Sequence, residues 1–231
     1  MPAMHALDTT HGTLNAPLAT GSRMPATTPV QSFPPAARAD ARVLILGSMP
    51  GTASLAAARY YAHPRNQFWP IMGALVGADA ALPYPERLLA LQDARIALWD
   101  VMASCVRPGS LDARIDSSSV VANDIVGFLE AHPAIHSVFF NGAAAETAFR
   151  RHVLPTLNAL PRMPGLHRLP STSPAHAARG FEDKLEAWRA VTAALQDRDA
   201  PRLRSRVVVE LPHGRPHATT VPGAGTIRFP G

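Results

Sequence analysis

Four short apolar runs recur along the chain, and each is closed by a polar or turn-forming residue. They span residues 42–46, 95–99, 137–140 and 166–170, and glycine, aspartate, asparagine and serine follow them in that order. Short apolar runs between turn signals are typical of buried parallel strands. We therefore predict four strands, of which the partly polar 166–170 lies at a sheet edge.

The segments between these runs carry the three- and four-residue spacing of helices. In the last of them Leu185, Trp188 and Val191 fall on one stripe, and Ser119 is a candidate N-cap for another. The predicted helices span residues 68–76, 86–92, 119–130, 143–152 and 181–195. Strands that alternate with helices predict an α/β fold, a three-layer α/β/α sandwich around a small parallel sheet.

Composition divides the chain into a central domain, residues 42–197, and two tails. Residues 1–41 are rich in proline, threonine, alanine and serine without sustained periodicity, which predicts a disordered leader. Residues 198–231 carry six arginines against two acidic residues and are predicted to be a basic, disordered tail, in which valines 207–209 are a candidate short strand. The formal net charge of +5 therefore arises mainly in this tail.

Several classes of protein are disfavoured by composition. The single cysteine, Cys105, forms no internal disulfide, which fits a reducing compartment. No apolar run approaches the ~18 residues that a membrane span requires, and the N-terminus lacks the pattern of a secretory signal. We expect a cytoplasmic protein without a membrane partner.

Each unusual polar motif follows a predicted strand. The motifs are Gly47–Gly51, Asp100, Asn141–Gly142 and Ser171–Pro174. Ligands of open α/β sheets bind at the carboxyl ends of the strands. These motifs are therefore predicted to meet in one site.

Two further segments favour recognition of a nucleic-acid base. Residues 60–69 place four aromatics, a histidine, an arginine and an asparagine in ten positions, although the whole chain has 6% aromatics. Aromatic faces stack on bases, and amide or imidazole groups read base edges. Residues 171–176 offer hydroxyls, a proline bend and a histidine, which can pinch a DNA backbone or simply cap a helix.

Taken in order, these motifs resemble the hypoxanthine-DNA glycosylase branch, family 6, of the uracil-DNA glycosylase superfamily. The resemblance runs from about residue 42 to 192. It rests on Gly-Ser-Met-Pro-Gly at 47–51, Tyr-Tyr-Ala-His-Pro-Arg-Asn-Gln-Phe-Trp at 60–69, Leu-Trp-Asp-Val at 98–101, Gly-Ser-Leu-Asp at 109–112, Phe-Phe-Asn-Gly at 139–142 and Ser-Thr-Ser-Pro at 171–174.

The resemblance implies a four-stranded parallel sheet and a monofunctional glycosylase that needs no metal or cofactor. Such an enzyme flips a deaminated base, here hypoxanthine, out of DNA and hydrolyses its N-glycosidic bond in base-excision repair. The implied partner is DNA that contains a deaminated base. A monomer associated with a bacterial nucleoid is expected.

The resemblance also assigns roles to motifs. Residues 47–51 form a wall of the base pocket, and the loop 171–174 enters the minor groove or compresses the backbone. Relatives that act on mismatched uracil carry asparagine where this chain has Met49, so the water-handling role moves to Asn66. His176 stands where asparagine is more common in this branch.

These roles define three groups of candidate residues. The candidate catalytic residues are Asn66 and Ser48. The candidate base-binding residues are Gly47, Met49, Pro50, Gly51, Tyr61, His63, Phe68, Asp100 and Asn141. The candidate DNA-binding residues are Arg65, Ser171, Thr172, Ser173, Pro174 and His176.

Several alternatives stay open from the sequence. His63 either donates to the leaving base or forms a structural turn, and Asp100 either orients a partner or caps a helix. Arg65 and Arg107 are candidates for phosphate contacts. Uracil or xanthine is an alternative substrate. A noncatalytic DNA-binding protein of the same fold and a flavodoxin-like enzyme are the rival classes, although no Gly-rich phosphate loop supports the latter.

Overall fold

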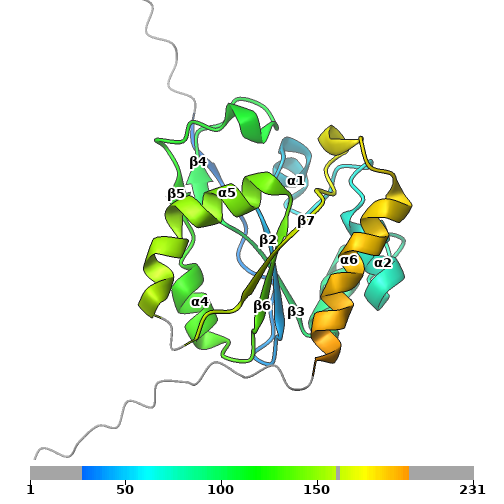
Figure 1. The fold of residues 1–231 in the computed structure, drawn as a ribbon. Coiled ribbons are helices and arrows are strands. Elements are labelled where there is room, and N and C mark those ends of the chain that lie inside the picture. Colours follow the sequence, from blue (N-terminus) through cyan, green and yellow to red (C-terminus); the bar gives the residue numbers. More distant parts are fainter. Residues whose placement is uncertain (1–27, 160–161, 198–231) are drawn as a thin grey trace, which may run out of the picture.

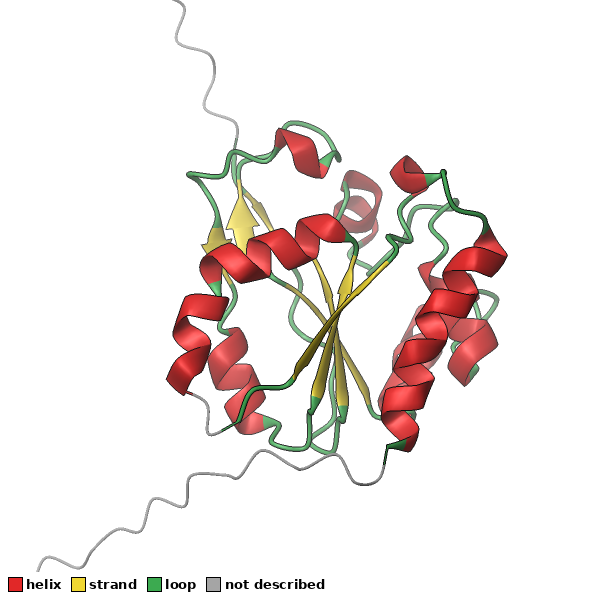
Figure 2. Cartoon of the chain, in the orientation of Figure 1, coloured by secondary structure: helices red, strands yellow, loops and turns green. Residues whose placement is uncertain are grey.

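A computed structural model describes residues 28–159 and 162–197 of the protein. Four parallel strands form one twisted sheet, and helices cover both of its faces (Figures 1 and 2). This is the three-layer α/β/α sandwich predicted from the sequence. The strands, in the spatial order β3-β2-β6-β7, are β2 (Val43–Gly47), β3 (Ile96–Asp100), β6 (Ser137–Asn141) and β7 (Gly165–Leu169).

The central strand β2 shows why these runs are continuously apolar. All five of its residues are buried. Val43 and Ile45 enter one core with Trp188, whereas Leu44 and Leu46 enter the opposite core with Phe149. Both faces of a sheet covered by helices must be apolar, so the strand shows no alternation. The more polar β7 lies at the edge, as predicted.

Helices α2, α3 and α6 cover one face of the sheet, and α4 and α5 cover the other (Figure 1). The helices are α1 (Thr52–Ala57), α2 (Phe68–Val76), α3 (Tyr84–Asp93), α4 (Ile125–Ala131), α5 (Ala143–His152) and α6 (Phe181–Gln196). Short 3-10 turns are η1 (Asp112–Arg114), η2 (Leu154–Ala159) and η3 (Pro174–His176). Four of the five predicted helices therefore form close to their predicted bounds, while the short α1 has no counterpart among the predictions.

The predicted helix start at Ser119 is wrong. Residues Val121–Ala122 form β5, which pairs antiparallel with β4 (Met102–Cys105). Helix α4 begins only after Asp124, whose carboxylate accepts a hydrogen bond from the Gly127 N–H at 2.9 Å. Asp124 directly precedes the apolar residues of α4, and its carboxylate accepts a hydrogen bond from an otherwise unpaired helix N–H. Asp124 is therefore the N-cap, and the more distant Ser119 is not.

The folded part also begins earlier than residue 42. Val30–Gln31 forms β1, which pairs antiparallel with β4, and Ala36 bridges to Leu98. The Phe33 carbonyl accepts a hydrogen bond from the Trp99 indole N–H at 2.9 Å. The prediction of disorder is therefore wrong for residues 28–41, because their backbone groups form hydrogen bonds with the strands. Composition alone does not reveal such bonds.

Other sequence-based expectations fall outside the described residues. Residues 1–27 and 198–231, with the candidate strand at 207–209, lie beyond the part of the chain that the structure describes. Within the described part, no helix has the length and apolar character needed to cross a membrane.

Candidate active site

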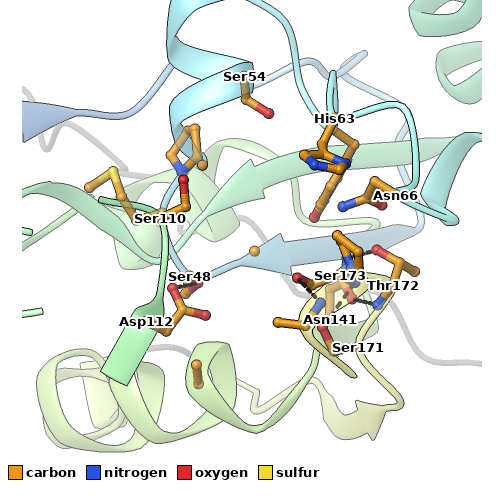
Figure 3. A pocket seen from close by; sticks show the side chains of 18 of the residues that line it. Ser48, Ser54, His63, Asn66, Ser110, Asp112, Asn141, Ser171, Thr172 and Ser173 are labelled. Atoms are coloured by element: carbon orange, nitrogen blue, oxygen red, sulfur yellow. Dashed lines mark hydrogen bonds between the residues drawn. The ribbon is translucent and has the colours of Figure 1, made fainter. Parts of the chain in front are cut away.

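A cavity of about 620 Å³ opens at the carboxyl edge of the four-stranded sheet. The last residues of three adjacent strands line it: Gly47 of β2, Asp100 of β3 and Asn141 of β6. Loops that follow the strands complete the wall (Figure 3). The structure brings all candidate site residues to this cavity except Arg65 and Phe68.

Gly47 lies where two cavity-lining side chains approach the backbone. It is the register partner of Asp100 in the β2–β3 pair. A Cβ atom on Gly47 would overlap the Asp100 carboxylate oxygen Oδ1 and lie 3.1 Å from the Tyr61 hydroxyl. Glycine at this position therefore lets both side chains lie against the strand end.

The turn after Gly47 is held from behind by Arg107. The Arg107 side chain is fully buried, and its guanidinium donates to the carbonyls of Met49, Pro50 and Gly109. The expectation that Arg107 contacts phosphates is therefore wrong, because its donors are used inside the protein. Arg107 instead fixes the shape of the turn that lines the cavity.

Asp112 enters the site although it was not among the candidate residues. The Ser48 hydroxyl donates to Asp112 Oδ1 at 3.0 Å, and Arg107 approaches the same oxygen at 3.8 Å. Nearby, the Thr52 N–H donates to Ser110 Oγ at 3.0 Å. The Gly-Ser-Leu-Asp segment at 109–112 is part of the family resemblance, but the sequence alone does not show that it folds over the motif at 47–51.

Asp100 is a buried carboxyl group at the edge of the cavity. The residue is 3% exposed, and its Oδ2 has no hydrogen-bond partner among the described residues. Burial, reinforced by the negative charge of Asp112 and opposed by Arg107, raises the pKa of Asp100 to about 8. The carboxyl is therefore mostly protonated at neutral pH and presents an O–H donor. It does not cap a helix, because β4 follows at once.

Tyr61 forms the aromatic surface of the site. Its backbone has a φ of 53°, a left-handed conformation that is rare for a bulky residue. Its ring stacks on Phe68 with centroids 4.0 Å apart. Phe68 itself is fully buried and packs edge-on against Trp188. The expectation that Phe68 contacts the base is wrong, because the apolar core takes up its ring; it supports Tyr61 from behind.

His63 and Asn66 are oriented by backbone N–H groups of their own segment. The Arg65 N–H donates to His63 Nδ1 at 3.1 Å, so in the neutral ring the proton lies on Nε2. The Phe68 N–H donates to Asn66 Oδ1 at 2.9 Å. In Figure 3 the Asn66 amide nitrogen lies on the side of the cavity, toward His63. Both side chains thus offer a donor to the site.

The loop after β7 is tied to the end of β6 by a reciprocal pair of hydrogen bonds. Asn141 Nδ2 donates to Thr172 Oγ1, and the Thr172 N–H donates to Asn141 Oδ1, both at 2.9 Å. The buried Thr172 also accepts from the Gln67 N–H at 3.0 Å through its carbonyl. The loop is therefore anchored on two sides, and one N–H of the Asn141 amide takes no part in this pair.

The remaining loop residues have local as well as cavity-facing contacts. Ser173 caps η3 by accepting a hydrogen bond from the Ala175 N–H, so the capping alternative also holds. His176 is exposed at the end of η3, and Arg65 is exposed outside the cavity. Among the described residues no group of three histidine, cysteine or acidic side chains is placed to hold a metal ion. The lining of the site includes two tyrosines, hydroxyl, amide and imidazole groups, and the Asp100 and Asp112 carboxyls.

Comparisons with known proteins point to one family. Residues 34–196 match the family model of the uracil DNA glycosylase superfamily. The chain is 37% identical over 113 residues to a hypoxanthine DNA glycosylase of Methanosarcina barkeri, a match that covers 48% of this chain and 70% of that protein. A hypoxanthine DNA glycosylase of Methanosarcina acetivorans is 34% identical over 116 residues, covering 50% of this chain and 72% of that protein.

A solved structure has a similar fold. It is the solution NMR structure of a candidate uracil DNA glycosylase from Methanosarcina acetivorans, with a TM-score of 0.60 and 29% sequence identity. The similarity covers 73% of this chain and 99% of that chain.

Proposed function

This chain belongs to the uracil DNA glycosylase superfamily and is a DNA glycosylase, and from that premise we propose that it excises hypoxanthine from DNA by hydrolysis of the N-glycosidic bond. The observation that carries the proposal is the hydrogen-bonding set of the cavity, in which the buried Asp100 carboxyl, whose pKa is raised, and the Ser48 hydroxyl line the same pocket. The relatives named hypoxanthine DNA glycosylases support the same substrate.

In the proposed complex the base is read by one acceptor and several donors. Hypoxanthine offers acceptors at O6 and N7 and a donor at N1. The Asp100 O–H, the second Asn141 N–H and the backbone N–H groups of Ser48 and Met49 serve the acceptors. Ser48 Oγ donates to Asp112 and can accept from N1–H. Adenine carries an amino donor where hypoxanthine carries O6, so these donors disfavour the normal base.

Bond cleavage is proposed to proceed through charge separation. As the bond breaks, its electron pair passes to the base and the sugar becomes cationic. A hydrogen bond from Asp100 strengthens as negative charge develops on the base, which lowers the energy of the transition state. Asn66 Nδ2 donates to a water and leaves a lone pair of that water free to attack C1′, after which the proton passes to solvent. The His63 Nε2–H is a second donor facing the leaving base.

DNA itself is proposed to contact the rim of the cavity. The loop 171–174, the exposed His176 and the exposed Arg65 stand around its opening or beside it. Phosphate contacts there position the duplex without reading its sequence. We further propose that the enzyme acts as a monomer on the DNA of a bacterial nucleoid.

The decisive test is single-turnover cleavage of labelled oligonucleotides that contain hypoxanthine, uracil or xanthine. Wild-type protein is expected to excise hypoxanthine fastest, and Asn66→Ala is expected to lower that rate by about 100-fold or more, because correct positioning of a reactant contributes on this scale. Arg189→Met, far along α6 from the cavity, serves as the control. Excision of uracil alone would reject hypoxanthine as the substrate. Full activity of Asn66→Ala would reject its catalytic role.

A further inference from the structure

The Ser48 side chain lines the cavity from a backbone that is held in place by its neighbours. The Met102 N–H donates to the Ser48 carbonyl at 3.1 Å, and the Val101 N–H donates to the Gly47 carbonyl at 2.9 Å. The buried Arg107 guanidinium holds the turn that follows. Ser48 Oγ therefore has a defined place in the cavity wall, and what remains to be set is the direction of its hydroxyl hydrogen.

Asp112 sets that direction. It is the first residue of η1, and Figure 3 shows its side chain beside that of Ser48 at the same wall of the cavity. The Ser48 hydroxyl donates to Asp112 Oδ1 at 3.0 Å, and the fully buried Arg107 guanidinium lies 3.8 Å from the same oxygen. A guanidinium only donates and an ionised carboxylate only accepts, so this oxygen serves both neighbours as an acceptor. The Ser48 hydrogen therefore points to Asp112, and a lone pair of Ser48 Oγ stays available to the cavity.

The two carboxyl groups of the cavity differ in charge. Burial raises the pKa of Asp112, but the Ser48 hydrogen bond, the Arg107 guanidinium and His176 all oppose the rise. The side chain of Asp112 is also 38% exposed. Asp100, by contrast, is mostly protonated at neutral pH, because burial and the charge of Asp112 raise its pKa to about 8. Asp112 is therefore the ionised member of the pair, as its role of acceptor requires.

A fixed acceptor meets different chemistry in a normal base and in its deaminated product. The ring nitrogens N1 of adenine and N3 of cytosine carry a lone pair, which a second acceptor opposes. Hydrolysis of the neighbouring amino group gives hypoxanthine or uracil, and the same ring nitrogen then carries an N–H beside a new carbonyl. An acceptor gains a hydrogen bond from this N–H, whereas a bare ring nitrogen leaves both groups unsatisfied.

We propose that Asp112 is a positioning residue that determines base specificity: it holds the Ser48 hydroxyl as an acceptor, so the cavity takes a base with a ring N–H and rejects a base with a bare ring nitrogen. This inference rests on the proposed function in that the cavity reads a base, but it applies to uracil as well as to hypoxanthine. Without Asp112 the hydroxyl can rotate and donate to a bare nitrogen. The two kinds of base are then no longer separated at this contact.

The test measures equilibrium affinity for duplexes whose target nucleotide carries a 2′-fluoroarabino sugar, which resists cleavage. Hypoxanthine is compared with adenine, and uracil with cytosine. Wild-type protein should prefer the base with the ring N–H, and Asp112→Ala should reduce that preference about tenfold, the scale of one discriminating hydrogen-bonded contact. The cost of extracting a given base from the duplex is the same for every variant, so a change in preference reports the cavity. Asp116→Ala, which also removes an acceptor of a serine hydroxyl but lies outside the cavity lining, should keep the preference.

Two further variants separate this role from a structural one. Asp112→Asn should keep most of the preference, because the amide oxygen must face the Arg107 donors and can accept from Ser48 from the same position. In a Ser48→Ala background, Asp112→Ala should change the preference no further, since the hydroxyl that it orients is gone. An effect that persists in that background would place the action of Asp112 on another group, such as Asp100, and would overturn the inference.

The remaining outcomes distinguish this inference from the proposed function. A preference that Asp112→Ala leaves unchanged would overturn the inference alone. A uniform loss of affinity for all four bases, together with a lower Tm, would overturn it in favour of a structural role. A preference for uracil only, lost in Asp112→Ala, would reject hypoxanthine as the substrate and support the role of Asp112. No preference in the wild-type protein would overturn both.

Discussion

At the scale of the single residue, Asp100 links the chemistry of the site to the stability of the fold. Its carboxyl is buried and lacks a partner for Oδ2 among the described residues, so the charged form is disfavoured in the folded protein. The protonated form is the one that we propose donates to the base. The same burial that supplies the donor therefore costs stability once the proton is lost.

This cost predicts a specific pH dependence. The pKa of Asp100 rises from 3.8 to about 8 on folding, so between these values the folded protein holds a proton that the unfolded chain releases. Stability must then fall as pH rises from about 4 to about 8, by at most about 6 kcal/mol. Asp100→Asn cannot titrate and removes this contribution. Its Tm relative to wild type should therefore rise steadily from pH 4 to pH 8.5, whereas a constant difference would contradict the account.

The sequence predicts which residues form this site better than it predicts which groups those residues contact. Asn66, Asp100 and Asn141 could be placed together because each follows from a motif at a strand end or an aromatic-rich segment. That Tyr61 faces the cavity while Phe68 lies behind it depends on the left-handed backbone at Tyr61, which residue identity does not reveal. The burial of Arg107 depends likewise on two carbonyls distant in sequence, those of Met49 and Pro50.

At the scale of the element, the ends of β6 and β7 act as one unit. The reciprocal pair between Asn141 and Thr172 joins the last residue of β6 to the loop that follows β7. The Gln67 N–H, just before α2, reaches the same loop. The end of β6, the loop after β7 and the start of α2, which are far apart in sequence, are thus joined through Thr172 at the wall of the cavity.

A double-mutant cycle tests that connection. Asn141→Ala and Thr172→Val each remove one partner of the pair, and each should destabilise the protein by about 1–3 kcal/mol, because a buried polar partner is left unsatisfied. The double variant should lose less than the sum, with a coupling energy of about 1 kcal/mol in denaturant unfolding. Strict additivity would show that the two side chains do not act as a pair. Thr192→Val, which removes a hydrogen bond to the Arg189 carbonyl within α6, is the matched control.

Elements with long periodic or apolar patterns are the ones that the sequence predicts well. Helices α2 and α5 have their predicted bounds, and all four strands of the main sheet are present. The two-residue strands β1 and β5 have no detectable period, because so few residues cannot define one. The predicted start of α4 is wrong because residues 121–122 pair with β4 and Asp124, not Ser119, caps the helix.

At the scale of the whole molecule, the N-terminal segment 28–36 belongs to the folded unit. It supplies β1, and the Phe33 and Pro34 carbonyls accept hydrogen bonds from the Trp99 indole and the Tyr60 hydroxyl. Both of those aromatic residues are buried, and Tyr60 also lines the candidate active-site cavity. The segment therefore connects the outer edge of the sheet to the site.

Two truncations isolate the contribution of this segment. A chain that lacks residues 1–36 should unfold about 5 °C below one that lacks only 1–27, because buried donors of Trp99 and Tyr60 lose their acceptors. Thermal unfolding followed by circular dichroism measures the difference, and single-turnover excision shows whether the site is disturbed as well. Equal Tm values for the two truncations would mean that residues 28–36 add nothing to the fold. The layered architecture could be predicted from the sequence, whereas this boundary could not, because it depends on tertiary hydrogen bonds.

The double anchoring of the loop 171–174 has a mechanical consequence. Thr172 is buried and bonded to Asn141 and Gln67, so the loop resists displacement. When a DNA duplex contacts a loop that does not move, the duplex must deform instead of the loop. The energy of that deformation depends on the base sequence and pairing at the contacted step. Damaged pairs yield at lower cost than intact ones. If the loop contacts DNA as proposed, its rigidity makes the ease of local duplex deformation the property by which a lesion is found.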